Sequence, residues 1–548
     1  MVGIYNWIIY KQTSRTVVKE VGKFMLITEM LARNAREYPH EVSLIEREPA
    51  IGRRREITWL EFEQQANSLA NNLIEQGVKK DDKVAILLMN CLEWLPAYFG
   101  VLKTGALVVP LNFRFEAEEI KKCLDVAEVK TLIYGPEFKE RIEQIKGELG
   151  FVESFIYVGE DCPAEDEGFT KIISEVSSEE PQIEISENDE AALYFTSGTT
   201  GTPKPILLTQ ANLTSACFTE NNHHRQKHED SFLCIPPLYH TGAKMHWFGG
   251  LLVGAKAVLL KGVKPQWIMQ AVSEEQVSIV WLLVPWAQDI LDAIERGDVN
   301  LKEYQLKQWR LMHIGAQPVP PSLIIRWKKY FPQQKYDTNY GLGESTGPGC
   351  VHLGLENIHK VGAIGVPGFN WQVKIVDENG NSLPAGRVGE LVVKGPGVMK
   401  GYYKNQEATA KVLRDDWLFT GDMAKMDRDG FVYLVDRKKD VVIMGGENIF
   451  PVEIEDFLRS HETIRDAAII GMPDPRLGEI PTAIIELKPG KVLSEEMVKE
   501  FCQGLPRYKR PRLIFFDKVP RNPTGKIEKP KLREKYCNSD CKPMAASC

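Results

Sequence analysis

The sequence contains no apolar run of the roughly 20 residues that a membrane-spanning helix needs. Its opening, MVGIYNWIIYKQ, is apolar over only about eight or nine residues and lacks the small-residue cleavage site of a signal peptide. We expect this segment to form an extra helix packed on the body of the protein, with contact to a membrane surface as the alternative. The absence of a spanning or export segment predicts a cytoplasmic protein.

The chain also lacks a cysteine framework and an excess of positive charge. Its 10 cysteines are scattered and form no CxxC pair, which favours reduced thiols over disulfides or zinc ligands. With 68 Lys and Arg against 75 Asp and Glu, the net charge of −7 gives no reason to expect a nucleic-acid partner. A length of 548 residues exceeds one ordinary core, so we expect two or more domains.

Strand-like and helix-like patterns alternate through most of the chain. Short apolar runs typical of buried strands occur at 83–89, 132–134, 155–158, 231–235 and 257–260. Amphipathic stretches separate these runs, and the alternation predicts a layered α/β fold with parallel sheets. After about Gly362, short β runs broken by turns predict a β-rich subdomain.

A charged, turn-like stretch, Asp436–Asp440, separates this part from the last hundred or so residues, which have their own pattern of helices and strands. The predicted division is a large N-terminal domain over 1–435, a connecting stretch over 436–440 and a small α+β domain over 441–548. The expected fold class is therefore α/β, with layered α/β subdomains and a β-rich subdomain followed by a small C-terminal domain.

The strongest functional signal is a loop rich in Ser, Thr and Gly that follows an apolar run, YFTSGTTGTPK at 194–204. Glycines let the backbone approach a polyanion closely, hydroxyls and amides donate to phosphate oxygens, and Lys204 adds positive charge. It is not a Walker A loop, which needs GxxxxGK[ST] leading into a helix. The pattern predicts a phosphate-binding loop between two extended segments, whereas a flexible linker rarely follows a buried strand directly.

Together with this loop, six further segments resemble, in the same order, the adenylate-forming superfamily of acyl-CoA synthetases, aryl-CoA ligases, peptide-synthetase adenylation domains and beetle luciferases. These segments are HIGAQP at 313–318, YGLGES at 340–345, WLFTGD at 417–422, DRKKD at 436–440, GGEN at 445–448 and NPTGK at 522–526. The resemblance runs from about Ile27 to Lys535. It implies that a carboxylic acid reacts with ATP to give an acyl-adenylate and pyrophosphate, and that the acyl group then passes to coenzyme A.

The resemblance also implies roles for individual residues of the large domain. The pyrophosphate end of ATP is expected to contact Thr196, Ser197, Gly198, Thr199, Thr200, Gly201 and Lys204. The segment beside adenine is expected to be Gly315, Ala316 and Gln317. Tyr340 matches the residue that gives adenine an aromatic face, and Glu344 matches a ligand of Mg²⁺. Asp422 matches the carboxylate that accepts both ribose hydroxyls.

Further residues match the family's moving parts. Arg437 is expected to reach the ribose, and Lys439 falls where the family pivots its small, mobile C-terminal domain, so 436–440 is the implied hinge. Gly446 matches the loop that lines the pantetheine tunnel after rotation. Lys526 matches the catalytic lysine that bridges the carboxylate and the α-phosphate in the first step, then withdraws.

One position departs from the family pattern. The family usually has threonine directly before the glutamate that matches Glu344, and this chain has Gly343. Because one neutral hydrogen bond contributes only about 0.5–1.5 kcal/mol net, and water can replace it, we expect a Gly343→Thr variant to be tolerated.

The segment around Pro236–Gly242 concerns the acid. No aspartate follows Tyr239 and His240 until Asp289, and the first glutamates are Glu274 and Glu275, so activation of an amino acid, whose ammonium needs a partner near this segment, is disfavoured. His240 resembles the gate or pocket residue of fatty-acid and aryl-acid enzymes. Met245, Trp247 and Phe248, with Gly249 and Gly250, indicate either an apolar acid pocket or ordinary helix core. A medium- or long-chain fatty acid is the first expectation, and an aromatic or alicyclic acid is the alternative.

Coenzyme A is the expected acceptor because the chain ends after the lysine loop, without a carrier domain. A stand-alone enzyme that loads a separate acyl carrier protein is the alternative, and luciferase chemistry is a remote one. A catalytically dead scaffold is expected to have lost Lys526, Glu344 or Lys204, and all three are present. The expected partners are thus a small carboxylic acid, ATP, Mg²⁺ and coenzyme A, without nucleic acid, and homodimers are common in the family.

Overall fold

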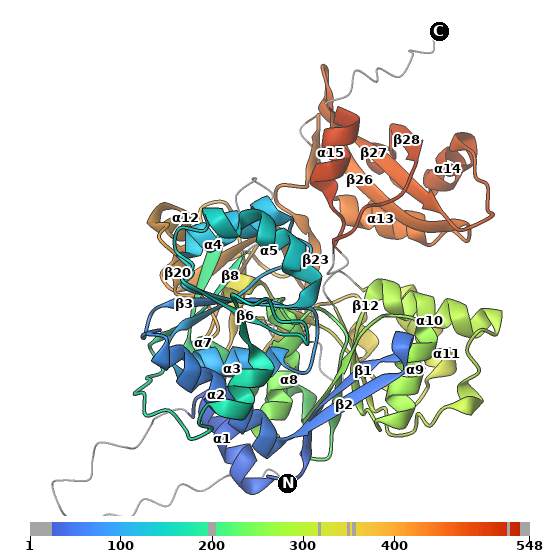
Figure 1. Cartoon of the computed structure of the whole chain (residues 1–548). Helices are drawn as coiled ribbons and strands as arrows, with labels where there is room; N and C mark the ends of the chain where they lie inside the picture. Colours follow the sequence, from blue (N-terminus) through green and yellow to red (C-terminus); the bar gives the residue numbers. More distant parts are fainter. Residues whose placement is uncertain are drawn as a thin grey trace, which may run out of the picture.

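The computed structural model describes residues 25–195, 204–315, 319–347, 351–352, 358–445, 447–522 and 526–537. The first 24 residues and the final 11, including the N-terminal aromatic segment, lie outside these ranges. Figure 1 shows a large N-terminal part and, above it, a small C-terminal part that contains α13, β26, β27 and α15. Among the residues that are described, every helix is too short or too polar to span a bilayer.

An eight-stranded sheet, mostly parallel, forms one half of the large part. Its strand order is β20-β9-β8-β4-β3-β5-β6-β7, and the β8–β9 and β9–β20 pairs are antiparallel. The strands are β3 (Lys83–Leu87), β4 (Leu107–Pro110), β5 (Thr131–Tyr134), β6 (Ser154–Tyr157), β7 (Glu167–Gly168), β8 (Glu190–Phe195), β9 (Pro205–Thr209) and β20 (Gly401–Tyr402).

Alternation along β3 places helices on both faces of this sheet. Val84 and Ile86 pack in a core shared with α1 (Ile27–Glu37), α2 (Trp59–Glu75) and α3 (Trp94–Lys103). Ala85 and Leu87 face the opposite core, which α4 (Ala117–Ala127) and α5 (Lys139–Ile145) cover. The short α6 (Phe169–Glu175) adds to the first core. An apolar strand buried on both sides is what the continuous run at 83–89 predicted.

A second sheet, with seven strands in the order β14-β13-β12-β10-β11-β1-β2, forms the other half. All its pairs are parallel except β1–β2. The strands are β1 (Val42–Glu48), β2 (Arg53–Thr58), β10 (Ser231–Cys234), β11 (Lys256–Leu260), β12 (Ile279–Leu283), β13 (Leu311–Gly315) and β14 (Lys335–Asp337). Its outer face is covered by α9 (Pro265–Glu274), α10 (Val284–Arg296) and α11 (Pro321–Tyr330).

Two helices, α7 (Gln210–His224) and α8 (Thr241–Val253), lie between the two sheets and share one core with both. In Figure 1 they occupy the centre of the large part, between β3 and β12. Trp247 stacks on Trp59 of α2, and Phe248 meets Phe99 of α3 edge to face. The arrangement is the layered α/β fold that the sequence predicted.

The β-rich part follows. A five-stranded antiparallel sheet consists of β18 (Gln372–Val376), β19 (Val388–Lys394), β21 (Leu413–Arg414), β22 (Trp417–Met426) and β23 (Val432–Arg437). A smaller sheet consists of β15 (Asn339–Tyr340), β16 (Val351–His352) and β17 (Val366–Pro367), and β15 directly follows β14 in the chain. The helix α12 (Gln406–Val412) precedes β21. Of the predicted connecting stretch, Asp436 and Arg437 are the last residues of β23, and only 438–440 form a turn.

The C-terminal part has its own sheet, ordered β25-β24-β27-β26 with β28 paired to β27, and its own hydrophobic core. The strands are β24 (Val442–Met444), β25 (Glu447–Ile449), β26 (Ile464–Asp474), β27 (Gly478–Leu487) and β28 (Leu513–Phe516). The helices are α13 (Pro451–Arg459), α14 (Glu495–Phe501) and α15 (Lys529–Cys537). The predicted fold class, a large layered α/β part with a β-rich subdomain and a small α+β domain, is confirmed.

Candidate functional site

Asp422 is the centre of the first group of predicted site residues. The antiparallel register of β22 and β23 pairs Asp422 with Arg437, and the Arg437 Nε lies 3.3 Å from the Asp422 Oδ1. The phenol of Tyr340, from β15, donates to the Asp422 Oδ2 at 2.5 Å. Burial lowers the pKa of Arg437, but the negative charges around it, of which Asp422 contributes most, together outweigh burial, and the pKa lies above its ordinary value. The fold thus joins Tyr340, Asp422 and Arg437.

A hollow of about 370 Å³ opens beside this group, lined by Thr420, Gly421, Asp422, Arg437, Lys438 and Lys439. Its size suits a small ligand. The carboxylate and the guanidinium at its wall provide acceptors and donors, as the predicted ribose contacts require. Lys439, the implied pivot, lies at the same wall, and burial lowers its pKa.

Glu344 belongs to a second group. It lies in a short 3₁₀ turn, Gly343–Ser345, and its Oε1 accepts a hydrogen bond of 2.8 Å from the Tyr402 phenol. The Lys204 Nζ lies 5.5 Å from the centre of the Tyr402 ring. Tyr402 pairs with Ile206 in the β20–β9 ladder, so the sheet edge brings Lys204, Tyr402 and Glu344 together. No sequence signal marked Tyr402, because only the pairing of two distant strands places it here.

Lys526 reaches both groups from the C-terminal domain. Its backbone N–H donates to the Asn522 Oδ1, and the Asn522 N–H donates to the Lys526 carbonyl, both at 2.9 Å, which ties the base of its loop. Burial, and then the charge of Arg437, lower the pKa of the Lys526 ammonium to about 8, although Asp422 and Glu344 act in the opposite direction. Lys526 therefore lies among the charged groups of the large domain.

His240 lies immediately before α8, near the Lys526 ammonium. Its Nδ1 is buried and has no hydrogen-bond partner. Burial, and then the positive charges of Lys526 and Lys244, lower its pKa to about 3, so the imidazole is neutral near pH 7. Lys526 and His240 thus lie close enough for the charge of Lys526 to act on the imidazole.

Several predicted residues lie outside the described part of the chain. These are Thr196, Ser197, Gly198, Thr199, Thr200, Gly201, Ala316, Gln317 and Gly446. The strands on either side of the Ser/Thr/Gly loop are described: Phe195 of β8 pairs with Pro205 of β9, so the loop connects two neighbouring antiparallel strands. Gly315 is the last residue of β13.

Of the two interpretations of the apolar residues of α8, an acid pocket or ordinary helix core, the structure favours helix core. Met245, Trp247 and Phe248 are fully buried in the core between the sheets. A Cβ added at Gly249 would lie 2.9 Å from the Asn221 backbone N, and one at Gly250 would lie 2.9 Å from the Gln226 Oε1, so these glycines allow close packing rather than a pocket. The face of α8 that turns toward β12 carries Gly242 and His246, which lie beside Trp281. The sequence marked Gly242 only as the end of the segment that concerns the acid, and it did not mark His246.

At Gly343, a Cβ would lie 2.5 Å from the Ile206 Cδ1. A side chain at this position therefore requires the end of the Ile206 side chain to move. Whether the Gly343→Thr variant is tolerated, as the sequence predicted, depends on that movement.

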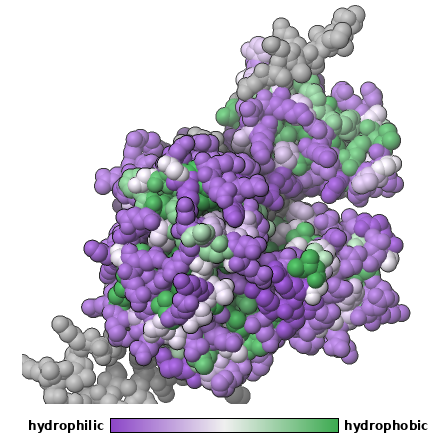
Figure 2. All heavy atoms as spheres, in the orientation of Figure 1, coloured by the Kyte–Doolittle hydropathy of each residue, from purple (hydrophilic) through white to green (hydrophobic). Residues whose placement is uncertain are grey.

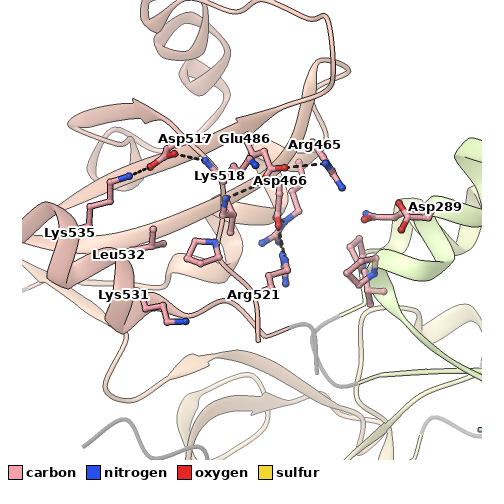
Figure 3. Close-up of a pocket in the computed structure, with 17 residues that line it drawn as sticks. Asp289, Arg465, Asp466, Glu486, Asp517, Lys518, Arg521, Lys531, Leu532 and Lys535 are labelled. Atoms are coloured by element: carbon pink, nitrogen blue, oxygen red, sulfur yellow. Dashed lines mark hydrogen bonds and ion pairs between the residues drawn. The ribbon is translucent and has the colours of Figure 1, made fainter. Parts of the chain in front are cut away.

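A wider groove, about 670 Å³, lies between the C-terminal domain and α10, where Figure 2 shows the surface hollowed. Figure 3 shows Asp289 on one side, facing Arg465 and Arg521 of the C-terminal domain on the other. Asp289, the first aspartate after His240 in the sequence, therefore lines this interdomain groove. Burial raises its pKa, and Arg465 lowers it in part.

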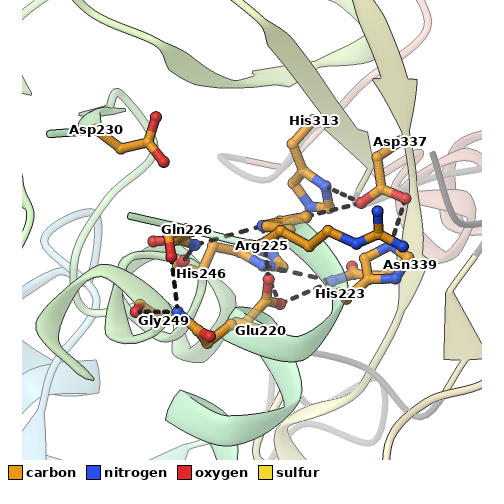
Figure 4. Close-up of polar contacts among 12 residues, drawn as sticks. Glu220, His223, Arg225, Gln226, Asp230, His246, Gly249, His313, Asp337 and Asn339 are labelled. Carbon is orange, nitrogen blue, oxygen red and sulfur yellow. Dashed lines mark hydrogen bonds and ion pairs between the residues drawn. The ribbon is translucent and has the colours of Figure 1, made fainter. Parts of the chain in front are cut away.

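A buried cluster of histidines and carboxylates joins the end of α7 to α8, β13 and β14 (Figure 4). Asp337, at the end of β14, contacts His223 and His224 at 2.6 and 2.7 Å and the His313 Nδ1 at 3.0 Å. Glu220 contacts the His224 Nδ1 at 3.0 Å and the His246 Nδ1 at 2.7 Å. Burial opposes both charged forms, yet the neighbouring histidines keep the pKa of each carboxylate well below its usual range.

His224 lies between the two carboxylates. Burial lowers its pKa, but Glu220 and Asp337 together raise it to about 10, so the ring is an imidazolium at neutral pH. His223, His224 and Asp337 are close enough to hold a metal ion. Both histidines already contact the Asp337 carboxylate directly, at 2.6 and 2.7 Å.

Comparison with known proteins places this chain among enzymes. A family model described as AMP-binding enzyme matches residues 31–403, and one described as AMP-binding enzyme C-terminal domain matches residues 453–526. A putative acyl–CoA ligase, YdaB of Bacillus subtilis strain 168, is 32% identical over 487 residues, which are 88% of this chain and 95% of the relative. A feruloyl-CoA synthase of an Amycolatopsis species is 33% identical over 509 residues, 92% of this chain and 98% of the relative.

Among solved structures, the anthranilate CoA ligase AuaEII in complex with anthranoyl-AMP is similar, with a TM-score of 0.86 and 26% identity, over 94% of this chain and 98% of that one. The matches cover both the large and the small part, in the same order. The chain therefore belongs to the adenylate-forming superfamily of AMP-binding enzymes, in its CoA-ligase branch, and is an AMP-forming acid–thiol ligase.

Proposed function

We propose that this enzyme activates an aromatic carboxylic acid as its acyl-adenylate and transfers the acyl group to coenzyme A. The observation that carries the first step is the position of Lys526, which the C-terminal domain places among Asp422, Arg437 and Glu344 of the large domain. An ammonium group there offsets the repulsion between a carboxylate and the α-phosphate of ATP.

The chemistry of the two steps assigns roles to the residues around Lys526. In the first step a carboxylate oxygen attacks the α-phosphorus, the bond from that phosphorus to the bridging oxygen breaks, and pyrophosphate leaves. Asp422 and Arg437 hold the ribose beside their hollow, and Tyr340 is held next to the adenine by its bond to Asp422. Lys526 contacts the oxygens on which negative charge develops.

Glu344 fits a site for Mg²⁺. One of its oxygens accepts from Tyr402, and the other remains to bind a metal that takes one or two carboxylates along with phosphate oxygens. The ion would neutralise phosphate charge. Tyr402 orients the carboxylate, and because burial and Glu344 raise the pKa of its phenol, it remains a hydrogen-bond donor.

In the second step the thiol of coenzyme A attacks the acyl carbon, the bond to the phosphate oxygen breaks, and AMP leaves. We propose that the small domain, 441–548, turns about 436–440 and replaces Lys526 with the loop that contains Gly446. Lys526 is needed in the first step and has to be absent from the second. A lysine on a separate, mobile domain meets both requirements, whereas a lysine of the large domain would not.

The aromatic acid replaces the fatty acid as the first choice. Two of the three similar proteins above are named for aromatic acyl groups, feruloyl and anthranoyl. The apolar side chains of α8 that could have formed a pocket for a long chain are core residues instead. Beside Gly242 lie the rings of Trp281 and two histidines, His240 and His246, which suit a flat substrate.

A panel of acids tests the proposal. Pyrophosphate exchange with ATP and Mg²⁺ is measured for benzoic, cinnamic and C8–C16 fatty acids, and coenzyme A or a phosphopantetheinylated carrier protein is then added. We expect the best aromatic acid to exceed the best fatty acid by at least about tenfold in kcat/KM, since one missing contact is worth about 10–200-fold. Thioester should form with coenzyme A. If only fatty acids support exchange, the proposed aromatic substrate is wrong. If none of the tested acids supports exchange, the proposed adenylation is wrong.

Replacing Lys526 separates the half-reactions. Lys526→Ala should lower pyrophosphate exchange by at least about 100-fold, because the developing charge loses its cation. Formation of thioester from supplied acyl-adenylate should change less than about threefold, because the lysine is absent from that step. Lys499→Ala is the control, since it removes a lysine that is 54% exposed from the same domain. Equal loss in both half-reactions is the result that contradicts the role of Lys526.

The pKa of Lys526 predicts a pH dependence. A lysine with a pKa of about 8 carries its charge below that pH and loses it above. The kcat/KM for pyrophosphate exchange, which reports the free enzyme, should therefore fall as pH rises through about 8. In Lys526→Arg the remaining activity should not fall there, because arginine stays charged. A fall at the same pH in this variant would assign the titration to another group.

The close contact at Gly343 predicts a paired effect. Gly343→Thr alone should destabilise the protein by about 1–3 kcal/mol, because its Cβ meets the Ile206 Cδ1. Ile206→Val removes that methyl, so the double variant should regain most of the stability and bind ATP with near wild-type affinity. Thermal unfolding and ATP titration measure both. A double variant that is stable but binds ATP poorly shows that threonine at this position disturbs the nucleotide site itself.

A further inference from the structure

One charged side chain of α10 has no partner in its own domain. Asp292 and Glu295 of this helix both pair with Arg326 of α11. Arg296 pairs with a carboxylate in the loop that follows the helix. The Asp289 carboxylate, in contrast, accepts no hydrogen bond and forms no ion pair in the part of the chain that the structure describes. Its charge is therefore left to act on what lies across the interdomain groove.

The opposite wall of the groove is positively charged (Figure 3). Among the described residues, Asp289 is the only charged side chain that the large domain contributes to the lining. The C-terminal domain contributes nine charged side chains, of which three are carboxylates and six are positive: Arg459, Arg465, Lys518, Arg521, Lys531 and Lys535. Because the two walls carry opposite net charge, they attract each other across the groove.

Arg465 is the residue of this wall that acts most on Asp289. Loss of surrounding water raises the pKa of the Asp289 carboxyl, and among the charges around it Arg465 contributes most, ahead of Asp292 and Arg296. The Arg465 side chain is 58% exposed, and its Nη1 lies 3.3 Å from the Glu486 Oε1. A guanidinium has five N–H donors, so this contact leaves donors for a second carboxylate.

Arg465 is connected to the loop of Lys526 through its neighbour in the chain. Asp466 accepts from the Arg521 Nε at 2.7 Å and from the Arg521 Nη2 at 2.9 Å, which is a bidentate contact. Arg521 directly precedes Asn522, whose side chain accepts from the Lys526 N–H at 2.9 Å. An attraction that acts on Arg465 therefore acts on the base of the catalytic loop.

We propose that Asp289 is a positioning residue for the first step. Its attraction to Arg465 holds the C-terminal domain in the orientation in which Lys526 reaches Asp422 and Glu344. When the domain turns for the second step, Arg465 moves away from α10 and the attraction is lost. The pair therefore favours adenylation over thioester formation. This inference rests on the proposed function and adds a residue that sets the balance between its two steps.

Asp289→Asn removes the charge and keeps the size of the side chain. With the best acid of the panel, kcat/KM for pyrophosphate exchange is divided by kcat/KM for thioester formation from supplied acyl-adenylate. This ratio should fall about two- to fivefold, the range that one exposed charge pair gives. The difference from the wild type should shrink as NaCl rises from about 0.05 to about 0.5 M, because salt screens exposed charges. A salt-independent difference, or an equal loss in both half-reactions, overturns the inference.

Asp292→Asn is the matched control. Asp292 lies on the same helix and is 43% exposed, but its partner, Arg326, belongs to the large domain. The ratio in this variant should equal that of the wild type. If it falls as far as in Asp289→Asn, the net charge of α10 is the cause, and the assignment to Asp289 is wrong.

Arg465→Gln tests the partner. Alone, it should lower the same ratio by about the same factor as Asp289→Asn. The double variant should lower the ratio no further, because both substitutions remove one and the same interaction. Effects that multiply in the double variant would show that Asp289 and Arg465 act independently, which contradicts the proposed pair.

Failure of the inference is distinct from failure of the proposed function. If the wild type exchanges pyrophosphate and Lys526→Ala loses that exchange, but Asp289→Asn keeps the wild-type ratio, only the inference is wrong. If no acid supports exchange in the wild type, the proposed function is wrong, and the inference fails with it.

Discussion

The buried carboxylate of Asp422 is the contact on which the arrangement of the site depends. It accepts from Tyr340, pairs with Arg437 and attracts the ammonium of Lys526. A carboxylate out of water destabilises the fold unless donors and positive charges surround it. That requirement holds two strands of one sheet, a strand of another and a loop of a separate domain in one place.

The docking of the C-terminal domain is a balance of opposing terms. Burial of Lys526 disfavours its charge, and Arg437 adds repulsion, whereas Asp422 and Glu344 attract it. Because burial and repulsion outweigh the attraction, the pKa of the ammonium lies below its ordinary value, at about 8. Under the proposed function, the phosphates of ATP would add negative charge that attracts the lysine, and loss of pyrophosphate would remove part of it. This fits a domain that has to arrive for one step and leave for the next.

The buried cluster of histidines and carboxylates is a second polar centre of the large domain. The cluster of His223, His224, Asp337 and Glu220 is held together by direct contacts between its imidazoles and carboxylates. Because the ionised Asp337 can only accept, it also fixes the proton of His313 on the Nδ1.

The sequence by itself determined the class of fold and the order of the site segments. Apolar strands that alternate with helices require layers, and the motifs that contain Tyr340, Glu344, Asp422, Arg437 and Lys526 identify themselves through their neighbours in the chain. Only the tertiary structure decided that Tyr402 orients Glu344, that Trp247 and Phe248 are core residues, and that Trp281 and His313 face α8. These assignments depend on the pairing of distant strands and on which face of a helix is covered. Local residue patterns do not encode either, because both are set by the packing of the whole chain.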